Sequence, residues 1–120
     1  MADRALIISW GQPVRGREQH GLEVFDEALA YYGELQASQA IESFDVMMLE
    51  PNGLMDGCFV LRGSHAQLDA LAEDMRFRKL MVDASLIVDD LRLARGYTAG
   101  GIEQTMPLYA EAIGHVPQMA

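Results

Sequence analysis

Residues 41–63, IESFDVMMLEPNGLMDGCFVLRG, contain two apolar segments on either side of Pro51, Asn52 and Gly53. In the first segment, 41–49, apolar and polar residues alternate at first and the end is apolar on both faces. The second segment, 57–61, is apolar on both faces throughout. Two such segments joined by a turn sequence predict a β-hairpin. A strand without a polar face has to be covered on both sides, so we expect both faces of this sheet to be buried.

The segments around the hairpin predict two further strands and two helical regions. Residues 4–10 form a short β-branched and aromatic run typical of a central strand, and residues 86–95 predict a half-polar strand at a sheet edge. Residues 17–36 carry apolar side chains at steps of three and four, typical of an amphipathic helix whose inner face consists of Leu22, Phe25, Leu29 and Tyr32. After the hairpin, Ser64 and Gln67 form a capping-box sequence at a helix start, and Asp74 is a candidate N-cap for a second helical piece.

The order strand, helix, strand, strand, helix, strand predicts an α+β fold, a ferredoxin-like βαββαβ sandwich with a four-stranded antiparallel sheet. We expect one domain over residues 1–120, with its core in residues 4–95 and an added C-terminal helix over 102–114. Thr105 is the expected N-cap of that helix, because Pro107 is tolerated near a helix start. Both helices then cover one face of the sheet. The other face would expose more apolar surface than a monomer usually does, which predicts a homodimer through the sheet face.

Composition narrows the expected partners and location. Eighteen acidic and nine basic residues give a formal charge of −9, which repels nucleic-acid phosphates. Cys58 is the only cysteine and has no partner for an internal disulfide, and the N-terminal apolar run is too short to cross a membrane. We therefore expect a cytoplasmic protein that binds neither nucleic acid nor membrane.

The element order, the strands that are apolar on both faces and the helical break around 74–81 resemble the dimeric α+β barrel superfamily. This superfamily includes antibiotic-biosynthesis-type monooxygenases and YCII-related proteins. The resemblance implies dimers that often hold a small molecule between sheet and helices, and the monooxygenases of this type act without a metal or flavin. YCII-related proteins are similar in one further detail: a histidine near the start of the first helix, here His20, and an acidic-x-x-aromatic stretch after the second, here Asp74 to Phe77.

Two candidate catalytic residues follow from these observations. His20, near a helix start, is suited to act as an acid or base near neutral pH, and Asp74 would orient it. The alternatives are a surface histidine and a helix N-cap.

The candidate ligand pocket consists of Trp10, Arg17, Phe44, Asp45 and Phe59, and the alternative for the aromatic residues is core or dimer packing. The three histidines lack the spacing of metal ligands, so neither a metal nor another cofactor is expected.

The sequence thus supports two hypotheses. The first is a small dimeric protein that binds a small apolar organic molecule between helices and sheet, with cofactor-free catalysis left open. The alternative is a non-catalytic oligomerisation or interaction module, in which the C-terminal helix docks onto a neighbour.

Overall fold

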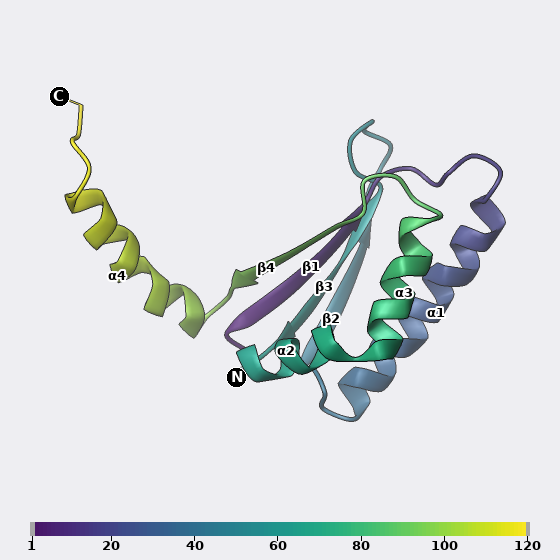
Figure 1. The fold of residues 1–120 in the computed structure, drawn as a ribbon, viewed down its shortest axis with the longest axis horizontal. Helices are drawn as coiled ribbons and strands as arrows, with labels where there is room; N and C mark the ends of the chain where they lie inside the picture. The colour runs from purple at the N-terminus through teal and green to yellow at the C-terminus, as the bar shows by residue number, and fades with distance from the viewer. Residues whose placement is uncertain (1, 120) are drawn as a thin grey trace.

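The computed structural model describes residues 2–119, which form a four-stranded antiparallel sheet with three helices on one face and a fourth helix apart from them (Figure 1). The sheet order is β2-β3-β1-β4. This arrangement confirms the predicted ferredoxin-like α+β sandwich. The elements are β1 (Arg4–Trp10), α1 (Glu18–Ala37), β2 (Ser43–Met48), β3 (Gly57–Gly63), α2 (His65–Glu73), α3 (Met75–Ser85), β4 (Arg92–Tyr97) and α4 (Gly100–Gly114).

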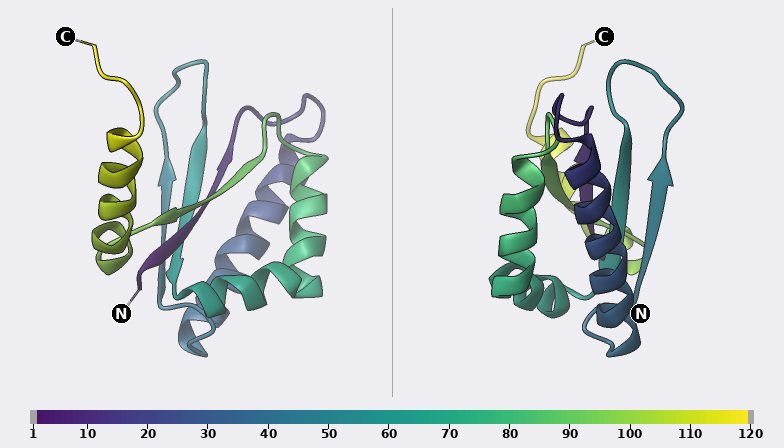
Figure 2. Two further views of the ribbon diagram at one scale, coloured as in Figure 1. Left: turned by 60° about the vertical axis from the view of Figure 1, so that its left-hand side comes forward. Right: turned by 90° about the vertical axis from the view of Figure 1, so that its right-hand side faces the viewer.

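The two faces of the sheet differ in what covers them. Ile8 of β1 lies opposite Phe59 of β3, and both side chains are buried under the helices. The neighbouring pair, Ile7 and Val60, points to the other face because side chains alternate along a strand. Ile7 is 40% exposed there. The views in Figure 2 show α1 and α3 together on one side of the sheet.

The predicted helix starts are confirmed. The Ser64 hydroxyl accepts a hydrogen bond from the backbone N–H of Gln67, whose side chain accepts from the backbone N–H of Ser64, so the capping box is complete. The Asp74 carboxylate accepts from the backbone N–H of Arg76 at the start of α3. α1 also lies where expected, but its inner face is rotated: Leu22 is 61% exposed, whereas Val24 is buried.

The fourth strand was predicted too early in the chain. β4 begins at Arg92, and Asp90 before it has a φ of 55°, in the left-handed region that interrupts an extended chain. The preceding residues instead bond to the loop after β1. Val14 N–H donates to the Ile87 carbonyl (2.8 Å), and Pro13 forms an isolated bridge with Val88. This segment closes over the space between β1 and α3.

The C-terminal helix covers the predicted residues 102–114, but its predicted N-cap, Thr105, was wrong. α4 begins at Gly100, and Thr105 lies inside it with its hydroxyl donating to the carbonyl of Gly101 (2.7 Å). Pro107 is an interior residue. α4 projects from the sheet (Figure 1), and the radius of gyration of 17.0 Å exceeds the roughly 14 Å expected of a compact chain of this length. Across residues 2–119, no helix combines the length and apolar character needed to span a membrane.

Candidate functional site

An apolar cavity of about 210 Å³ lies between the helices and the sheet. β1 contributes Ile8 and Trp10 to its walls, β3 contributes Phe59, and the segment after α3 contributes residues around Ile87. The helices α1 and α3 supply the remaining sides. The cavity therefore occupies the helix-covered face of the sheet, opposite the open face.

Short side chains at the helix positions that face the cavity explain why space remains there. Gly21 and Ala28 of α1 line the cavity, as does Ala84 of α3. Larger neighbours on the same helices, including Phe25 and Leu80, hold the helix backbones away from the sheet. Because the neighbours set the spacing, the small residues leave a volume that their own side chains do not fill.

Three aromatic rings form one wall of the cavity. The ring centroids of Trp10 and Phe59 are 5.4 Å apart, those of Phe25 and Phe59 are 5.5 Å apart, and those of Trp10 and Phe25 are 6.1 Å apart. Tyr32 packs edge-on against Phe59 at 4.9 Å. Such a wall presents flat apolar surface, which suits an apolar or aromatic ligand.

The polar groups at the cavity are few. Glu18 and Asp56 supply the carboxylates of its lining, and no basic side chain lines it among the described residues. The Tyr32 hydroxyl is buried and finds no hydrogen-bond partner within residues 2–119. Burial raises the pKa of Tyr32 above its ordinary value, so this side chain stays neutral. The cavity consequently offers no positive charge to an anionic ligand.

Of the residues proposed for the ligand pocket, some line the cavity and others lie beside or behind its wall. Trp10 and Phe59 line the cavity. Phe44 packs behind them, with its ring 6.5 Å from that of Phe59. Arg17 lies at the start of α1, where its guanidinium donates to the carbonyl of Leu86, beside the cavity wall.

Asp45 lies on the other face of the sheet. Its neighbour in β2, Phe44, packs against the core, so Asp45 points to the open side. There its carboxylate forms an ion pair with Arg62 of β3. The structure therefore does not bring Asp45 to the cavity.

His20 and Asp74 are not brought together either. The His20 side chain is 59% exposed, and its Nδ1 lies 3.2 Å from a Glu23 carboxylate oxygen. Asp74 accepts a hydrogen bond from the Tyr31 hydroxyl at 3.1 Å, and Tyr31 lies about 16 Å further along α1 than His20. Burial and this hydrogen bond raise the pKa of Tyr31 to about 12. The observed role of Asp74 is the N-cap of α3.

Sequence reasoning missed the small residues that create the cavity. Ala28 and Gly21 carry no chemical signal, and only their position opposite larger neighbours gives them importance. Tyr32 was expected on the inner face of α1, and its place in the spacing of apolar residues at steps of three and four was the available signal for it. No group of three or more His, Cys, Asp or Glu side chains suited to hold a metal ion occurs in residues 2–119.

Comparisons with known proteins match the fold. No family model matches the chain, and no curated protein matches it. Among solved structures, a dimeric protein of unknown function and ferredoxin-like fold from Bacteroides fragilis is similar, with a TM-score of 0.61 and 9% identity over 79% of this chain and 95% of that one. The chain has a ferredoxin-like fold.

A second similar structure is SnoaB, a cofactor-independent oxygenase from Streptomyces nogalater. The TM-score is 0.50, with 11% identity over 82% of this chain and 93% of that one. At these identities the likenesses show the fold alone, and this fold is the ferredoxin-like α+β sandwich expected from the sequence.

Proposed function

We propose that this protein is a homodimer whose subunits each bind a compact, largely apolar organic molecule in the cavity between helices and sheet. The observation that carries the proposal is the unfilled space of about 210 Å³ beside the aromatic wall of Trp10, Phe25 and Phe59. Protein cores are normally packed as tightly as organic crystals, so a vacant apolar volume of this size costs stability. A bound molecule would recover that loss.

The size and charge of the cavity define the ligand class. Pockets for drug-sized ligands commonly have volumes of about 300–1,000 Å³. This cavity, at about 210 Å³, is smaller, so it suits a molecule of one or two fused rings. The carboxylates of Glu18 and Asp56 repel an anion and attract a cation. We therefore expect neutral or cationic aromatic molecules to bind more tightly than the matching carboxylates.

The open face of the sheet supports the dimer. Ile7 lies between Val60 on β3 and Ala94 on β4, so the centre of this face is apolar. Met47 on β2 extends the apolar surface and is 52% exposed. The similar protein from Bacteroides fragilis is dimeric. Packing this face against the same face of a second copy removes the apolar surface from water.

Cofactor-free oxygenation is the reaction to test first on a molecule that binds. SnoaB, which has a similar fold, is a cofactor-independent oxygenase. Oxygen consumption with each bound aromatic compound measures this reaction directly. The proposal gives His20 no catalytic role, because its side chain is exposed.

The fluorescence of Trp10 provides a direct binding assay, because Trp10 is the only tryptophan and lines the cavity. We expect naphthalene-sized compounds to change its intensity or emission maximum in a saturable way. Amines and neutral compounds should bind with higher affinity than the matching carboxylates. His20→Ala should leave the response unchanged, since His20 lies outside the cavity lining. If no neutral, cationic or anionic compound of this size changes the emission, the binding proposal is refuted.

A further inference from the structure

We propose that α4 is an arm that packs against a second copy of this chain, on the surface formed by strand β2 and the loop that follows it. The inference rests on the proposed homodimer and goes beyond it, because it assigns the contact that α4 makes. It starts from the exposed apolar side of α4.

α4 has an apolar stripe that residues 2–119 leave about half exposed. Ile102, Met106, Tyr109 and Ile113 recur at helical spacing and are each between 47% and 62% exposed. Gly101 is the only α4 residue that is buried, within the part of the chain that the structure describes. Figure 1 shows the helix standing apart from the sheet. Its apolar side is therefore available to a partner.

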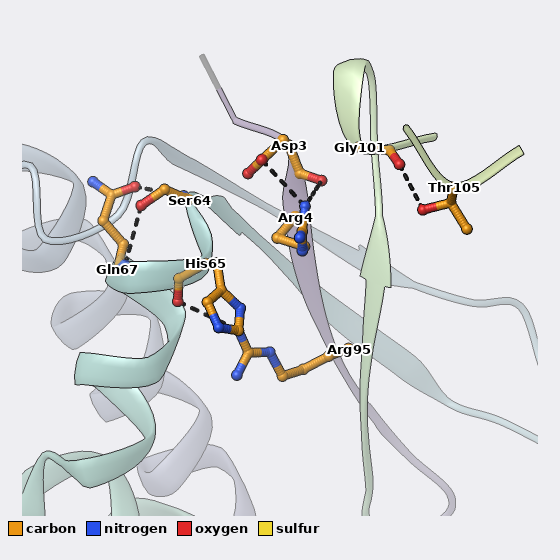
Figure 3. A network of polar contacts seen from close by, with 8 residues as sticks. All are labelled: Asp3, Arg4, Ser64, His65, Gln67, Arg95, Gly101 and Thr105. Atoms are coloured by element: carbon orange, nitrogen blue, oxygen red, sulfur yellow. Dashed lines mark hydrogen bonds and ion pairs between the residues drawn. The ribbon is translucent and has the colours of Figure 1, made fainter. Parts of the chain in front are cut away.

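The base of α4 is held firmly, so the helix projects in a defined direction. A Cβ atom on Gly101 would lie only 2.1 Å from the Asp3 carbonyl oxygen, which shows how closely the two backbones approach. Thr105 bonds to the Gly101 carbonyl one turn later (Figure 3). Next to this close approach of the two backbones, the Arg4 guanidinium lies 4.6 Å from the Tyr97 ring centroid. These contacts distinguish α4 from a loose tail.

α4 also needs a partner to be stable as a helix. A helix of 15 residues is marginal in water even with favourable residues. Pro107, in its interior, costs about 3 kcal/mol relative to alanine, and glycines at both ends weaken the helix further. Helices with such sequences are stabilised by burial of an apolar side. Contact with another molecule would provide that burial.

The area required for a stable dimer indicates that the partner is a second copy. Four strands of about seven residues present roughly 440 Å² on one face, and one side of a 15-residue helix covers roughly 220 Å². These are flat footprints, which are smaller than the accessible surface they represent; the sheet footprint is about half of the roughly 800 Å² of accessible surface that each partner buries in stable complexes. If each copy also gives one arm and receives the other, each buries roughly 900 Å².

The strand order indicates where the arm docks. With the order β2-β3-β1-β4, a two-fold axis parallel to the strands places β4 of one copy over β2 of the other. Met47, on the open face of β2, and Leu54, in the loop that follows, are exposed by 52% and 81%. An axis across the strands would bring the arm to the partner's β4 instead, where Arg92 is exposed on the open face. An apolar arm fits the apolar surface of Met47 and Leu54 better than a surface that carries Arg92.

The first test changes the arm without touching the folded core. Ile113→Glu places a charge in the apolar stripe, and we expect the dimer dissociation constant to rise at least tenfold, measured by light scattering over a dilution series. Gln104→Glu adds the same charge on the opposite side of α4 and should leave the constant unchanged. If Ile113→Glu dimerises as tightly as the wild type, the arm is refuted while the homodimer stands. A wild type that is monomeric at every concentration refutes both.

The second test locates the docking surface. A mixture of the single variants Leu54→Cys and Tyr109→Cys, treated with a short bismaleimide, should give a cross-linked dimer. Each variant treated alone controls for Cys58, which both contain and which is buried. If the protein is dimeric in solution but the mixture gives no more cross-linked dimer than the separate controls, docking at β2 and its loop is refuted.

Discussion

Filling the cavity from α1 should stabilise the ligand-free protein and abolish binding. Ala28 lines the cavity and is 5% exposed, so Ala28→Leu adds three carbon atoms inside the vacant space. Each buried methylene contributes about 0.8 kcal/mol, which gives an upper bound of roughly 2.4 kcal/mol. Imperfect fit reduces this gain, and we expect a net increase of about 1–2 kcal/mol in the free energy of unfolding. In thermal unfolding this corresponds to a Tm higher by roughly 4–8 °C.

A matched control and a binding assay complete the experiment. Ala30→Leu makes the same change on the exposed side of α1, where we expect a stability change within about 0.5 kcal/mol and an intact Trp10 fluorescence response to ligand. Ala28→Leu should lose that response. If Ala28→Leu instead lowers stability by about 1–3 kcal/mol, as overpacking of a filled core does, then the space is not available and the cavity argument is wrong.

Three further predictions concern the residues around the site. The pKa of Tyr31, raised to about 12, means that the neutral hydroxyl is favoured in the folded state, so its stabilising effect is complete below pH 10 and is lost as the pH rises through about 12. Tyr31→Phe should therefore show a smaller loss of stability than the wild type in urea unfolding between about pH 10 and pH 12, and an equal loss would contradict this cause. Asp74→Ala removes the α3 cap and should cost about 1 kcal/mol in urea unfolding with ligand binding intact; lost binding would instead connect Asp74 to the cavity. Gly57→Ala places a Cβ 2.6 Å from the Met47 carbonyl oxygen and 2.8 Å from Trp10, and we expect a loss of about 1–3 kcal/mol in thermal unfolding; an unchanged Tm would show that the strands shift apart easily.

Local signals predicted the order of the elements. The Pro51-Asn52-Gly53 turn, the Ser64 capping box and the Asp74 N-cap each depend on a few adjacent residues, so the sequence alone identifies them. The strand β4 was placed wrongly because its start depends on the left-handed conformation of Asp90, which an aspartate adopts only when its surroundings require it. The N-cap of α4 was placed at Thr105 because proline is tolerated near a helix start, whereas the helix accommodates Pro107 in its interior.

The site was harder to predict than the fold. Trp10 and Phe59 were identified because large aromatic side chains at strand positions attract attention as pocket walls. The decisive residues are Ala28 and Ala84, whose effect is the volume they leave empty. Asp45 was assigned to the pocket because a polar strand residue can face either a cavity or water, and alternation in β2 directs it to the open side. Empty volume is a property of several elements together and has no sequence pattern.

The cavity is built from residues of a single chain, on the side of the sheet away from the proposed contact between copies. Each subunit therefore carries a complete site, and the stoichiometry should be one molecule per chain. Diluting the protein until the copies separate would leave the number of sites the same. Occupancy would then follow the free concentration of the small molecule and not that of the protein.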